Sequence, residues 1–395
     1  MLKAADAFHA AGYDVRVVST RTAGWTTAAD EAIAASRRWT WRVVNYDRAE
    51  ATTTWLRSGA RHKAARAFAN LVTSVPLSVA THAYARVHRE LVDAILETPA
   101  DLIYGGTTGA IAAVAEAGRQ SGTTFAIDFE DYHCAEHEPS PGGTLSNTLG
   151  GLVMRWSADG AAFVTAGSAA IADACRSDLG IAAIPINNVF PLPSTAPEIT
   201  TRDPHAPFAV YWFSQTIGAN RGLEDVVHAL GLTRRSASFT LRGCPVPGYF
   251  EELRALAADV APRLDVRVVA PTSPASMVDE CRMFDLGVSA EQGHIRNRQL
   301  NLPNKATTYP LAGVPVVLTD TPGQRPLAVD LGCGALVFAP GDRDSLARQI
   351  LLLMNDASAH TKAREASWRA AHMRWHWEHE QEQGALLGAA ARAVA

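Results

Sequence analysis

A proline-rich interval near the middle of the chain separates two runs of alternating strand-like and helix-like sequence. Residues 191–207 hold five prolines and little hydrophobic periodicity, which is typical of a linker. On both sides of this interval, short apolar runs alternate with amphipathic stretches at helical spacing. Because strands that alternate with helices form parallel sheets covered by helices on both faces, the sequence predicts two α/β lobes.

The expected elements follow this alternation through both halves of the chain. Before the linker, the pattern predicts strands at 15–19, 101–104, 125–128 and 161–165, and helical stretches at 2–11, 52–96, 109–118 and 168–179. After the linker, it predicts strands at 208–213, 238–242, 265–269, 285–289 and 314–319, and helices at 223–230, 249–260 and 305–312. The sequence therefore predicts an N-terminal lobe over 1–190 and a C-terminal lobe over 208–365.

Composition excludes several broad classes of protein. Of the 395 residues, 47% are hydrophobic and 19% are charged, which excludes a disordered chain. A formal net charge of −4 excludes a global basic field for nucleic acid. Five cysteines without a Cys-x-x-Cys pair exclude a disulfide scaffold or zinc ribbon and favour a cytoplasmic location. No apolar run reaches the roughly 18 residues that span a bilayer, and neither a dinucleotide fingerprint nor a P-loop is present.

One stretch of the second half carries a resemblance to a known family. Residues 304–317 (NKATTYPLAGVPVV) resemble the P-N-K-L-F-E-Y-L-A-A-G-V-P-V-V segment of retaining family 4 glycosyltransferases. Further segments resemble that family in the right order, namely 101–104, 125–128, 168–171, 187–189, 214–225, 285–289 and 340–342. The resemblance therefore spans most of the chain.

The resemblance implies a fold and an activity. Members of this family have the GT-B fold, with two Rossmann-like lobes, an interlobe cleft, and a C-terminal helix, here 366–395, that crosses back to the N-terminal lobe. They move a sugar with retention from a nucleotide-diphosphate donor in the C-terminal lobe to a hydroxyl acceptor in the N-terminal lobe. The expected acceptor is a glycan, a lipid-linked group or a small molecule, and no metal or other cofactor is obligatory.

Two cationic residues are candidates for the donor site. Lys305 follows Asn304 at the start of a predicted helix, and Arg221 precedes Gly222 at the start of another. Positive side chains and helix amides aimed at a diphosphate stabilise the charge that develops on the leaving group. The alternative is that both residues are capping or solvated groups. The remaining donor-site candidates are Asn304, Thr308, Glu291 and Gly243.

The acceptor-side candidates follow the predicted strand at 125–128. Glu130, Asp131 and His133 place ionisable groups directly after a buried strand, which is typical of an active-site loop. Glu130 could orient an acceptor hydroxyl or take its proton, and His133 is the other candidate for that role. A capped loop with surface carboxylates is the alternative interpretation.

The sequence also departs from the family pattern. Thr308 stands where relatives carry a glutamate that holds the donor ribose, and Gln215 or Thr216 stands where they carry an arginine. Two alternatives therefore remain: a non-catalytic GT-B partner that binds a nucleotide, and another GT-B enzyme such as a sugar-nucleotide epimerase. Relatives also open with a strand, so the resemblance predicts about 15–30 residues before the first helix.

Two weaker patterns lie outside these motifs. Residues 55–68 (WLRSGARHKAARAF) are basic and contain aromatic side chains, so they are candidates for peripheral contact with the inner face of a membrane. A solvated helix is the alternative. His372, His376 and His379 share one helical face and could hold a metal, although packing of a terminal helix anchored by Trp375 explains the segment more simply.

Overall fold

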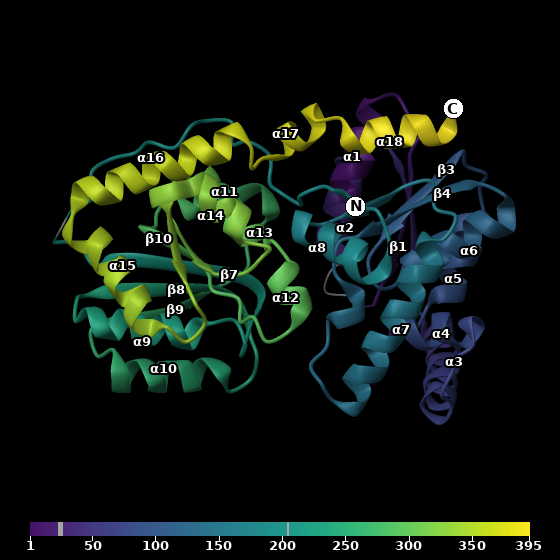
Figure 1. Ribbon diagram of the computed structural model, residues 1–395, viewed down its shortest axis with the longest axis horizontal. Coiled ribbons are helices and arrows are strands. Elements are labelled where there is room, and N and C mark those ends of the chain that lie inside the picture. Colours follow the sequence, from purple (N-terminus) through teal and green to yellow (C-terminus); the bar gives the residue numbers. More distant parts are fainter. Residues whose placement is uncertain (23–26, 204) are drawn as a thin grey trace. The chain divides into compact units, whose positions relative to one another are not determined.

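The computed structural model describes residues 1–22, 27–203 and 205–395 (Figure 1). These residues form two compact units. Unit 1 contains Met1–Ile186 together with Gln383–Ala395, and unit 2 contains Asn187–Glu382. The proline-rich residues 191–207 therefore belong to unit 2, and the last helix of the chain belongs to unit 1.

Unit 1 contains two sets of parallel strands. The first strand pairs with the second, and the next four form a sheet in chain order. The strands are β1 (Arg16–Arg21), β2 (Thr40–Asn45), β3 (Leu102–Gly106), β4 (Thr124–Phe129), β5 (Val164–Ala166) and β6 (Ile184–Pro185). The helices are α1 (Leu2–Ala10), α2 (Thr27–Ala35), α3 (Thr52–Leu71), α4 (Leu77–Tyr84), α5 (His88–Leu96), α6 (Ile111–Ser121), α7 (Pro141–Ala158), α8 (Ala169–Ala174) and α18 (Ala385–Val394), with short turns η2 (His133–Ala135) and η3 (Cys175–Leu179).

Helices pack on both faces of β3. Ile103 packs in a cluster with apolar side chains of α5 and α6, whereas its neighbours Leu102 and Tyr104 pack in a cluster with α1 and α18. This division follows from the alternation of side chains along a strand. Phe8 and Leu386 belong to the second cluster, so the C-terminal helix lies beside the first helix (Figure 1).

The long helical stretch expected at 52–96 is three helices, which corrects the sequence interpretation. Pro76 is the N-cap residue of α4, and its backbone is extended with φ −59° and ψ 143°. Because proline has no amide hydrogen and disfavours helical geometry in the residue before it, the chain cannot continue α3 through this point. The resulting α3 and α4 pack against each other and against α7.

Unit 2 contains one parallel sheet of six strands in the order β12-β11-β10-β7-β8-β9. The strands are β7 (Phe208–Ile217), β8 (Ala237–Pro245), β9 (Leu264–Val269), β10 (Leu286–Ser289), β11 (Val316–Thr319) and β12 (Ala335–Phe338). The helices are α9 (Leu223–Thr233), α10 (Tyr249–Val260), α11 (Met277–Cys281), α12 (Arg296–Leu300), α13 (Asn304–Leu311), α14 (Arg325–Leu331), α15 (Arg343–Asn355), α16 (Ala357–Met373) and α17 (Trp377–Glu382), with short turns η4 (Pro274–Ser276) and η5 (Gly332–Gly334). The five strands predicted after the linker are confirmed.

The strand order of unit 2 reverses between β7 and β10. The chain runs from β7 outward through β8 and β9, then returns to add β10 on the other side of β7. In open parallel sheets, ligands bind outside the carboxyl ends of the strands at such a reversal. The loops after β7 and β10 therefore mark the edge of unit 2 where a site is expected.

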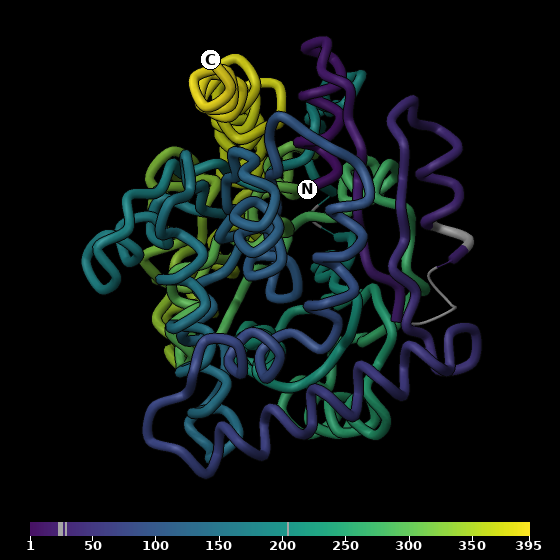
Figure 2. Tube along the Cα trace, turned by 90° about the vertical axis from the view of Figure 1, so that its right-hand side faces the viewer, coloured from purple at the N-terminus to yellow at the C-terminus, as the bar shows by residue number. Residues whose placement is uncertain are grey.

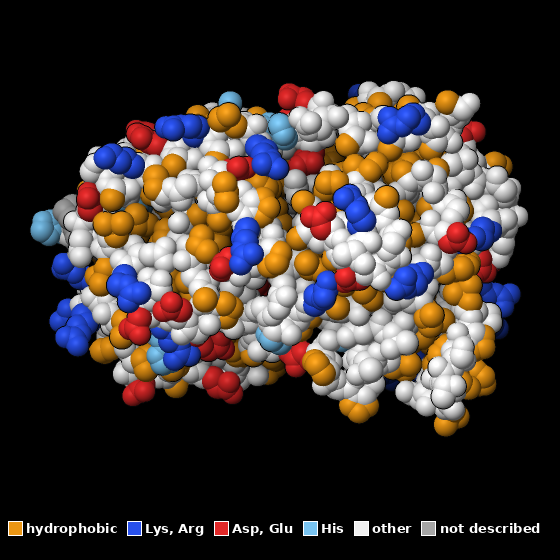
Figure 3. Space-filling model, in the orientation of Figure 1, with side chains coloured by type: hydrophobic (Ala, Val, Ile, Leu, Met, Phe, Trp, Pro, Cys, Tyr) orange, Lys and Arg blue, Asp and Glu red, His pale blue; other side chains and the backbone are white. Residues whose placement is uncertain are grey.

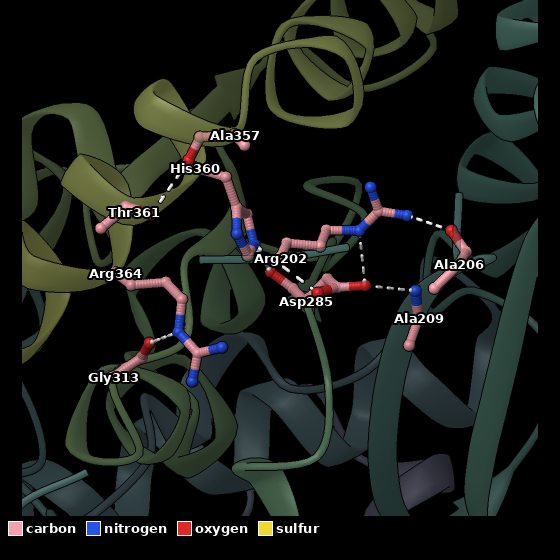
Figure 4. Close-up of polar contacts among 9 residues, drawn as sticks. All are labelled: Arg202, Ala206, Ala209, Asp285, Gly313, Ala357, His360, Thr361 and Arg364. Carbon is pink, nitrogen blue, oxygen red and sulfur yellow. Dashed lines mark hydrogen bonds and ion pairs between the residues drawn. The ribbon is translucent and has the colours of Figure 1, made fainter. Parts of the chain in front are cut away.

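A polar network fastens the proline-rich segment and α16 to the opposite edge of this sheet (Figure 4). Arg202 lies 3.2 Å from the Asp285 carboxylate, which also accepts the amide hydrogen of Ala209 at 2.8 Å. His360 Nε2 lies 2.9 Å from the carbonyl oxygen of Asp285, and Arg364 donates to the carbonyl of Gly313. The network therefore ties three separate segments of unit 2 together.

Candidate functional site

A buried ionic cluster lies at the carboxyl edge of the unit 2 sheet. Lys305, in the first turn of α13, donates a hydrogen bond from Nζ to Glu291 Oε1 at 2.5 Å. Arg221, in the loop between β7 and α9, places Nη1 3.7 Å from the other carboxylate oxygen of Glu291. Glu291 and Lys305 are buried, whereas Arg221 is partly exposed. One carboxylate therefore holds two cations that are far apart in sequence.

The electrostatics of this cluster favour an ionised Glu291. Burial opposes its charge, but the charge and hydrogen bond of Lys305, with further help from Arg221 and Arg298, hold the pKa of Glu291 below its ordinary value. Two cations and one anion leave the cluster with a net positive charge. The Lys305 ammonium also lies 5.6 Å from the ring centre of Trp212. The cluster is thus a preformed positive site at the end of a sheet.

Gly222 determines how Arg221 approaches Glu291. This residue has φ +71°, and a Cβ at its position would come within 2.0 Å of the Ala290 carbonyl oxygen. The loop after β7 therefore lies directly against the end of β10, which a side chain would prevent. This close approach places Arg221 beside Glu291, the residue that follows Ala290.

A second interaction ties α9 to a neighbouring loop. Asp225, in the first turn of α9, accepts hydrogen bonds from the side chain of Gln292, the amide of Gly341 and the guanidinium of Arg343. Because Asp225 is buried, these donors supply the hydrogen bonds that water would otherwise make to its carboxylate. The start of α9, the loop after β10 and the loop before α15 are therefore held as one group.

The other predicted donor residues are placed differently. Asn304 is the exposed first residue of α13, next to Lys305. Thr308 is fully buried, and its hydroxyl donates to the carbonyl of Asn304 at 2.7 Å. Gly243 lies near the end of β8, where a Cβ would come within 2.4 Å of the Ser214 carbonyl oxygen. The structure thus brings Arg221, Glu291 and Lys305 together. Donor binding by these three residues, and by Asn304, Thr308 and Gly243, stays a prediction.

In unit 1, the polar loop follows β4 as expected. Asp128, near the end of β4, accepts a hydrogen bond from Thr165 of β5 at 2.6 Å, and Tyr104 of β3 lies 2.7 Å from the same hydroxyl. Burial raises the pKa of Asp128, the Thr165 hydrogen bond partly offsets this effect, and the charge of Glu130 raises the pKa further. Hydrogen bonds between side chains therefore link the three adjacent strands β3, β4 and β5.

Glu130, Asp131 and His133 do not share one environment. Glu130 and Asp131 are partly exposed, whereas His133 is 1% exposed. The His133 ring packs edge-on toward Tyr84 and Phe129, and its Nδ1 lies 3.1 Å from a Glu136 carboxylate oxygen. Glu130 and Asp131 are therefore more accessible to solvent than His133.

Sequence reasoning missed Thr165 and Tyr104, whose side chains form the hydrogen bonds that link β3, β4 and β5. Thr165 is fully buried in β5, and the burial of Tyr104 raises the pKa of its hydroxyl well above the ordinary value. The available signal was the presence of one hydroxyl in each of two otherwise apolar strands. That signal is weak, because a hydroxyl in a strand is common and its partner becomes visible only after folding.

Two further observations concern the described residues as a whole. Within the described ranges, no group of three or more His, Cys, Asp and Glu side chains is arranged to hold a metal ion. The rings of His372, His376 and His379 instead follow one another, with centres 6.4 and 5.9 Å apart, and Trp375 is buried and donates to Asp330.

Among the same described residues, no helix is long and apolar enough to cross a membrane.

Comparisons with known proteins rest on structure. No family model matches the chain, and no curated protein matches it significantly in sequence. The chain is similar to sucrose-phosphate synthase from Thermosynechococcus elongatus, with a TM-score of 0.69, 13% identity and coverage of 100% of this chain and 92% of that chain. It is also similar to HepE from Anabaena in complex with UDP-glucose, with a TM-score of 0.67, 16% identity and coverage of 95% and 99%.

A third similar structure is a glycosyltransferase from Rickettsia africae, with a TM-score of 0.64, 11% identity and coverage of 97% of this chain and 91% of that chain. At these identities the likeness concerns the fold. The chain has the fold of the GT-B glycosyltransferases, which confirms the fold class expected from the sequence.

Proposed function

We propose that this protein is a glycosyltransferase that moves a sugar, with retention, from a nucleotide-diphosphate donor to a hydroxyl acceptor. The observation that carries the proposal is the buried Arg221–Glu291–Lys305 cluster at the point where the strand order of unit 2 reverses. HepE, a solved protein of the same fold, has been determined in complex with UDP and in complex with UDP-glucose. In this proposal, unit 2 binds the donor and unit 1 binds the acceptor.

The cluster has the charge that a diphosphate requires. A bound diphosphate brings about two negative charges, and its charge rises as the bond to the sugar breaks. Lys305 and Arg221 supply two positive charges, which the single charge of Glu291 neutralises only in part. Cations fixed in place before the reaction stabilise the leaving group without reorganising, and they act on the diphosphate as a divalent cation would. We therefore propose that transfer requires no metal.

The acceptor side of the proposal rests on the loop after β4. Glu130 and Asp131 are partly exposed at the carboxyl edge of the unit 1 sheet, where an acceptor hydroxyl would reach them. The neighbouring carboxyl of Asp128, by contrast, is held in a hydrogen bond with Thr165. We assign Glu130 to orienting the acceptor hydroxyl or receiving its proton, with Asp131 beside it. His133 is a less direct candidate because it is buried.

One observation favours a second function. Thr308 stands where members of the resembled family carry a glutamate that holds the donor ribose. Its hydroxyl already donates a hydrogen bond to the Asn304 carbonyl oxygen within its own helix. A hydroxyl also binds a ribose less strongly than a carboxylate. The competing proposal is therefore a protein that binds a nucleotide in unit 2 but does not turn it over. We place either protein in the cytoplasm.

A donor panel separates the two functions. Thermal unfolding is measured with UDP, GDP, TDP and ADP and their glucose derivatives, and release of the nucleoside diphosphate is measured in parallel. The transferase proposal predicts stabilisation by at least one donor together with slow hydrolysis of its sugar bond. Stabilisation without any release favours the non-catalytic protein, and the absence of stabilisation by every donor contradicts both.

A further inference from the structure

The helices at one end of unit 1 are built from sequence without carboxylates. Residues 51–89 contain no aspartate or glutamate, and neither do residues 139–158, although 40 of the 395 residues in the chain are acidic. The first of these segments contains six basic side chains, Arg57, Arg61, Lys63, Arg66, Arg86 and Arg89. This local excess of positive charge opposes the net charge of −4 of the whole chain.

Folding brings the two segments together. Ala69 of α3, Ala80 and Ala83 of α4, and Leu149 of α7 form one buried cluster. Arg66 donates to the hydroxyl of Ser146 at 3.2 Å, which links α3 to α7 directly. Figure 1 draws these helices at the same end of unit 1, and Figure 2 shows α3 along the lower edge of the view. The surface of this end is therefore free of carboxylates over two helices.

The outer side of α3 exposes large apolar side chains. Leu56 is 56% exposed, Phe68 is 45% exposed and Leu71 is 84% exposed, and Arg57 and Lys63 are exposed beside them. Positions 56, 63 and 71 are each separated by about two helical turns, so they follow one side of the helix, and positions 57 and 68 lie about three turns apart on the strip beside it. We call Leu56, Arg57, Lys63, Phe68 and Leu71 the α3 face. Figure 3 shows hydrophobic side chains at the lowest tips of the view, where Figure 1 draws α3 and α7.

The basic side chains of α3 have two different roles. Arg61 forms an ion pair with Glu90 at 2.5 Å, and Arg66 donates to backbone and side-chain oxygens of α4 and α7. These arginines hold the helices together. Within the described residues, no ion pair joins Arg57 or Lys63 to a carboxylate. The cations of the α3 face are therefore available to anions outside the protein.

We propose that the α3 face is a surface that binds an anionic lipid bilayer. A helix binds in the plane of a membrane when apolar side chains on one side enter the headgroup region and basic side chains attract anionic lipids. Nucleic acid would satisfy only the two cations and leave Leu71 and Phe68 in water. The absence of carboxylates on α3 and α7 removes the repulsion that an anionic surface would otherwise meet. This inference goes beyond the proposed function and does not depend on it.

Vesicle flotation of the whole protein tests the proposal. Binding is measured to vesicles of phosphatidylcholine alone and of phosphatidylcholine mixed with phosphatidylglycerol, at low and at physiological salt. The proposal predicts flotation with the anionic vesicles and weaker flotation as salt increases, because salt screens exposed charges. Failure to float with anionic vesicles at physiological salt, or equal flotation with both compositions, overturns it.

Matched variants then test the α3 face itself. Lys63→Gln removes one exposed lysine of the face, and Lys362→Gln removes an exposed lysine of α16 as its control. Leu56→Ser is compared with Leu352→Ser, since Leu352 of α15 is exposed to a similar extent, 59% against 56%. We expect Lys63→Gln to lower the vesicle partition coefficient about fivefold. Leu56→Ser should lower it about tenfold, and the controls should leave it unchanged.

Two results would contradict the assignment. Equal losses in the α3 variants and their controls would show that binding does not depend on this face. Displacement of the protein from vesicles by a single-stranded oligonucleotide, with oligonucleotide binding unchanged in Leu56→Ser, would identify the face as a phosphate-binding surface instead. Circular dichroism of each variant confirms that the helices are retained, because Leu56 and Lys63 are exposed and their replacement removes no core contact.

Discussion

Glu291 and Lys305 form a hydrogen-bonded ion pair of 2.5 Å in which both side chains are less than a tenth exposed. A buried pair of this kind is costly to assemble and costly to break, because each charge has lost its water. Lys305 is therefore fixed in direction before any ligand arrives. An incoming diphosphate would share the Lys305 ammonium with Glu291 rather than attract a mobile side chain.

Replacing Lys305 should remove most of the affinity for a nucleotide-diphosphate donor. Lys305→Ala deletes one of two cations in the cluster and leaves the Glu291 charge to repel the ligand. We expect the dissociation constant of the stabilising donor to rise at least about 30-fold, equivalent to about 2 kcal/mol. Isothermal titration or thermal shift measures this change, and Lys362→Ala is the control. Unchanged affinity in folded Lys305→Ala protein would refute the role in diphosphate binding.

The same variant should also be less stable, which requires a second measurement. Removing Lys305 leaves the buried Glu291 with only the more distant charges of Arg221 and Arg298, and breaking a buried pair costs about 3–5 kcal/mol. The double variant Lys305→Met with Glu291→Gln removes both charges and should recover much of this stability in urea unfolding. It should still bind the donor poorly, which distinguishes loss of the ligand contact from loss of the fold.

Much of unit 2 could be predicted from sequence, and part of unit 1 could not. The helix at 249–260 was predicted with its observed bounds, because Leu253 and Ala257 repeat at helical spacing behind a glycine. The helix at 141–158 was missed because its sequence is rich in glycine. It forms because Ser140 caps it, Pro141 suits its first turn, and its later turns are buried against neighbouring elements. Tertiary packing overrode the weak local preference.

The candidate site shows the same division. The two cations were predicted because each lies at the start of a helix within a recognisable motif. Glu291 was also a donor-site candidate, but its pairing with both cations was not predicted, because it lies 14 residues before Lys305 and the loop between them has no periodic pattern. His133 was predicted beside Glu130 because several ionisable residues follow the strand closely in sequence. Only packing between Tyr84 and Phe129 reveals that the histidine is buried.

Protonation of His360 should lower the free energy of unfolding of the protein in mild acid. Burial is the main cause that lowers the pKa of His360, with the charges of Arg364 and Arg202 adding to it and Asp285 opposing it. Its Nε2 faces a carbonyl oxygen, which can only accept, so Nε2 carries the proton of the neutral ring. The unfolded chain therefore takes up a proton near pH 6.5 that the folded protein resists. Stability contributed by this residue is present above that pH and is lost as the pH falls below it.

The pH effect is measured as a difference between two proteins. Urea unfolding of the wild type and of His360→Gln is compared at about pH 7.5 and about pH 5.5. The wild type should lose more free energy of unfolding than the variant, by at most about 1.4 kcal/mol per pH unit. Subtracting the variant removes the contributions of His62 and His82, whose pKa values are also lowered by burial. Parallel losses in both proteins would exclude His360 as the cause.

Gly222 should tolerate no side chain. Its φ of +71° disfavours alanine by about 1 kcal/mol, and the methyl group would also collide with the Ala290 carbonyl oxygen at 2.0 Å. Gly222→Ala should therefore lower the free energy of unfolding by at least about 3 kcal/mol and weaken donor binding, because the collision moves Arg221 away from Glu291. Gly248→Ala is the control, since Gly248 has φ +84° with open space around it. Equal effects of the two variants would contradict this account.

Glu130 and His133 should respond to substitution in opposite ways. Glu130 is partly exposed at the carboxyl edge of its sheet, so Glu130→Gln should leave unfolding nearly unchanged while lowering turnover about 100-fold, the effect expected for losing a general base. His133 is 1% exposed between aromatic rings, so His133→Ala should destabilise the protein by about 2–4 kcal/mol through the cavity it leaves. Donor turnover and urea unfolding are measured on both variants, with Glu138→Gln, an exposed glutamate later in the loop, as the control. A stable His133→Ala protein with abolished turnover, together with an active Glu130→Gln protein, would transfer the catalytic role from the glutamate to the histidine.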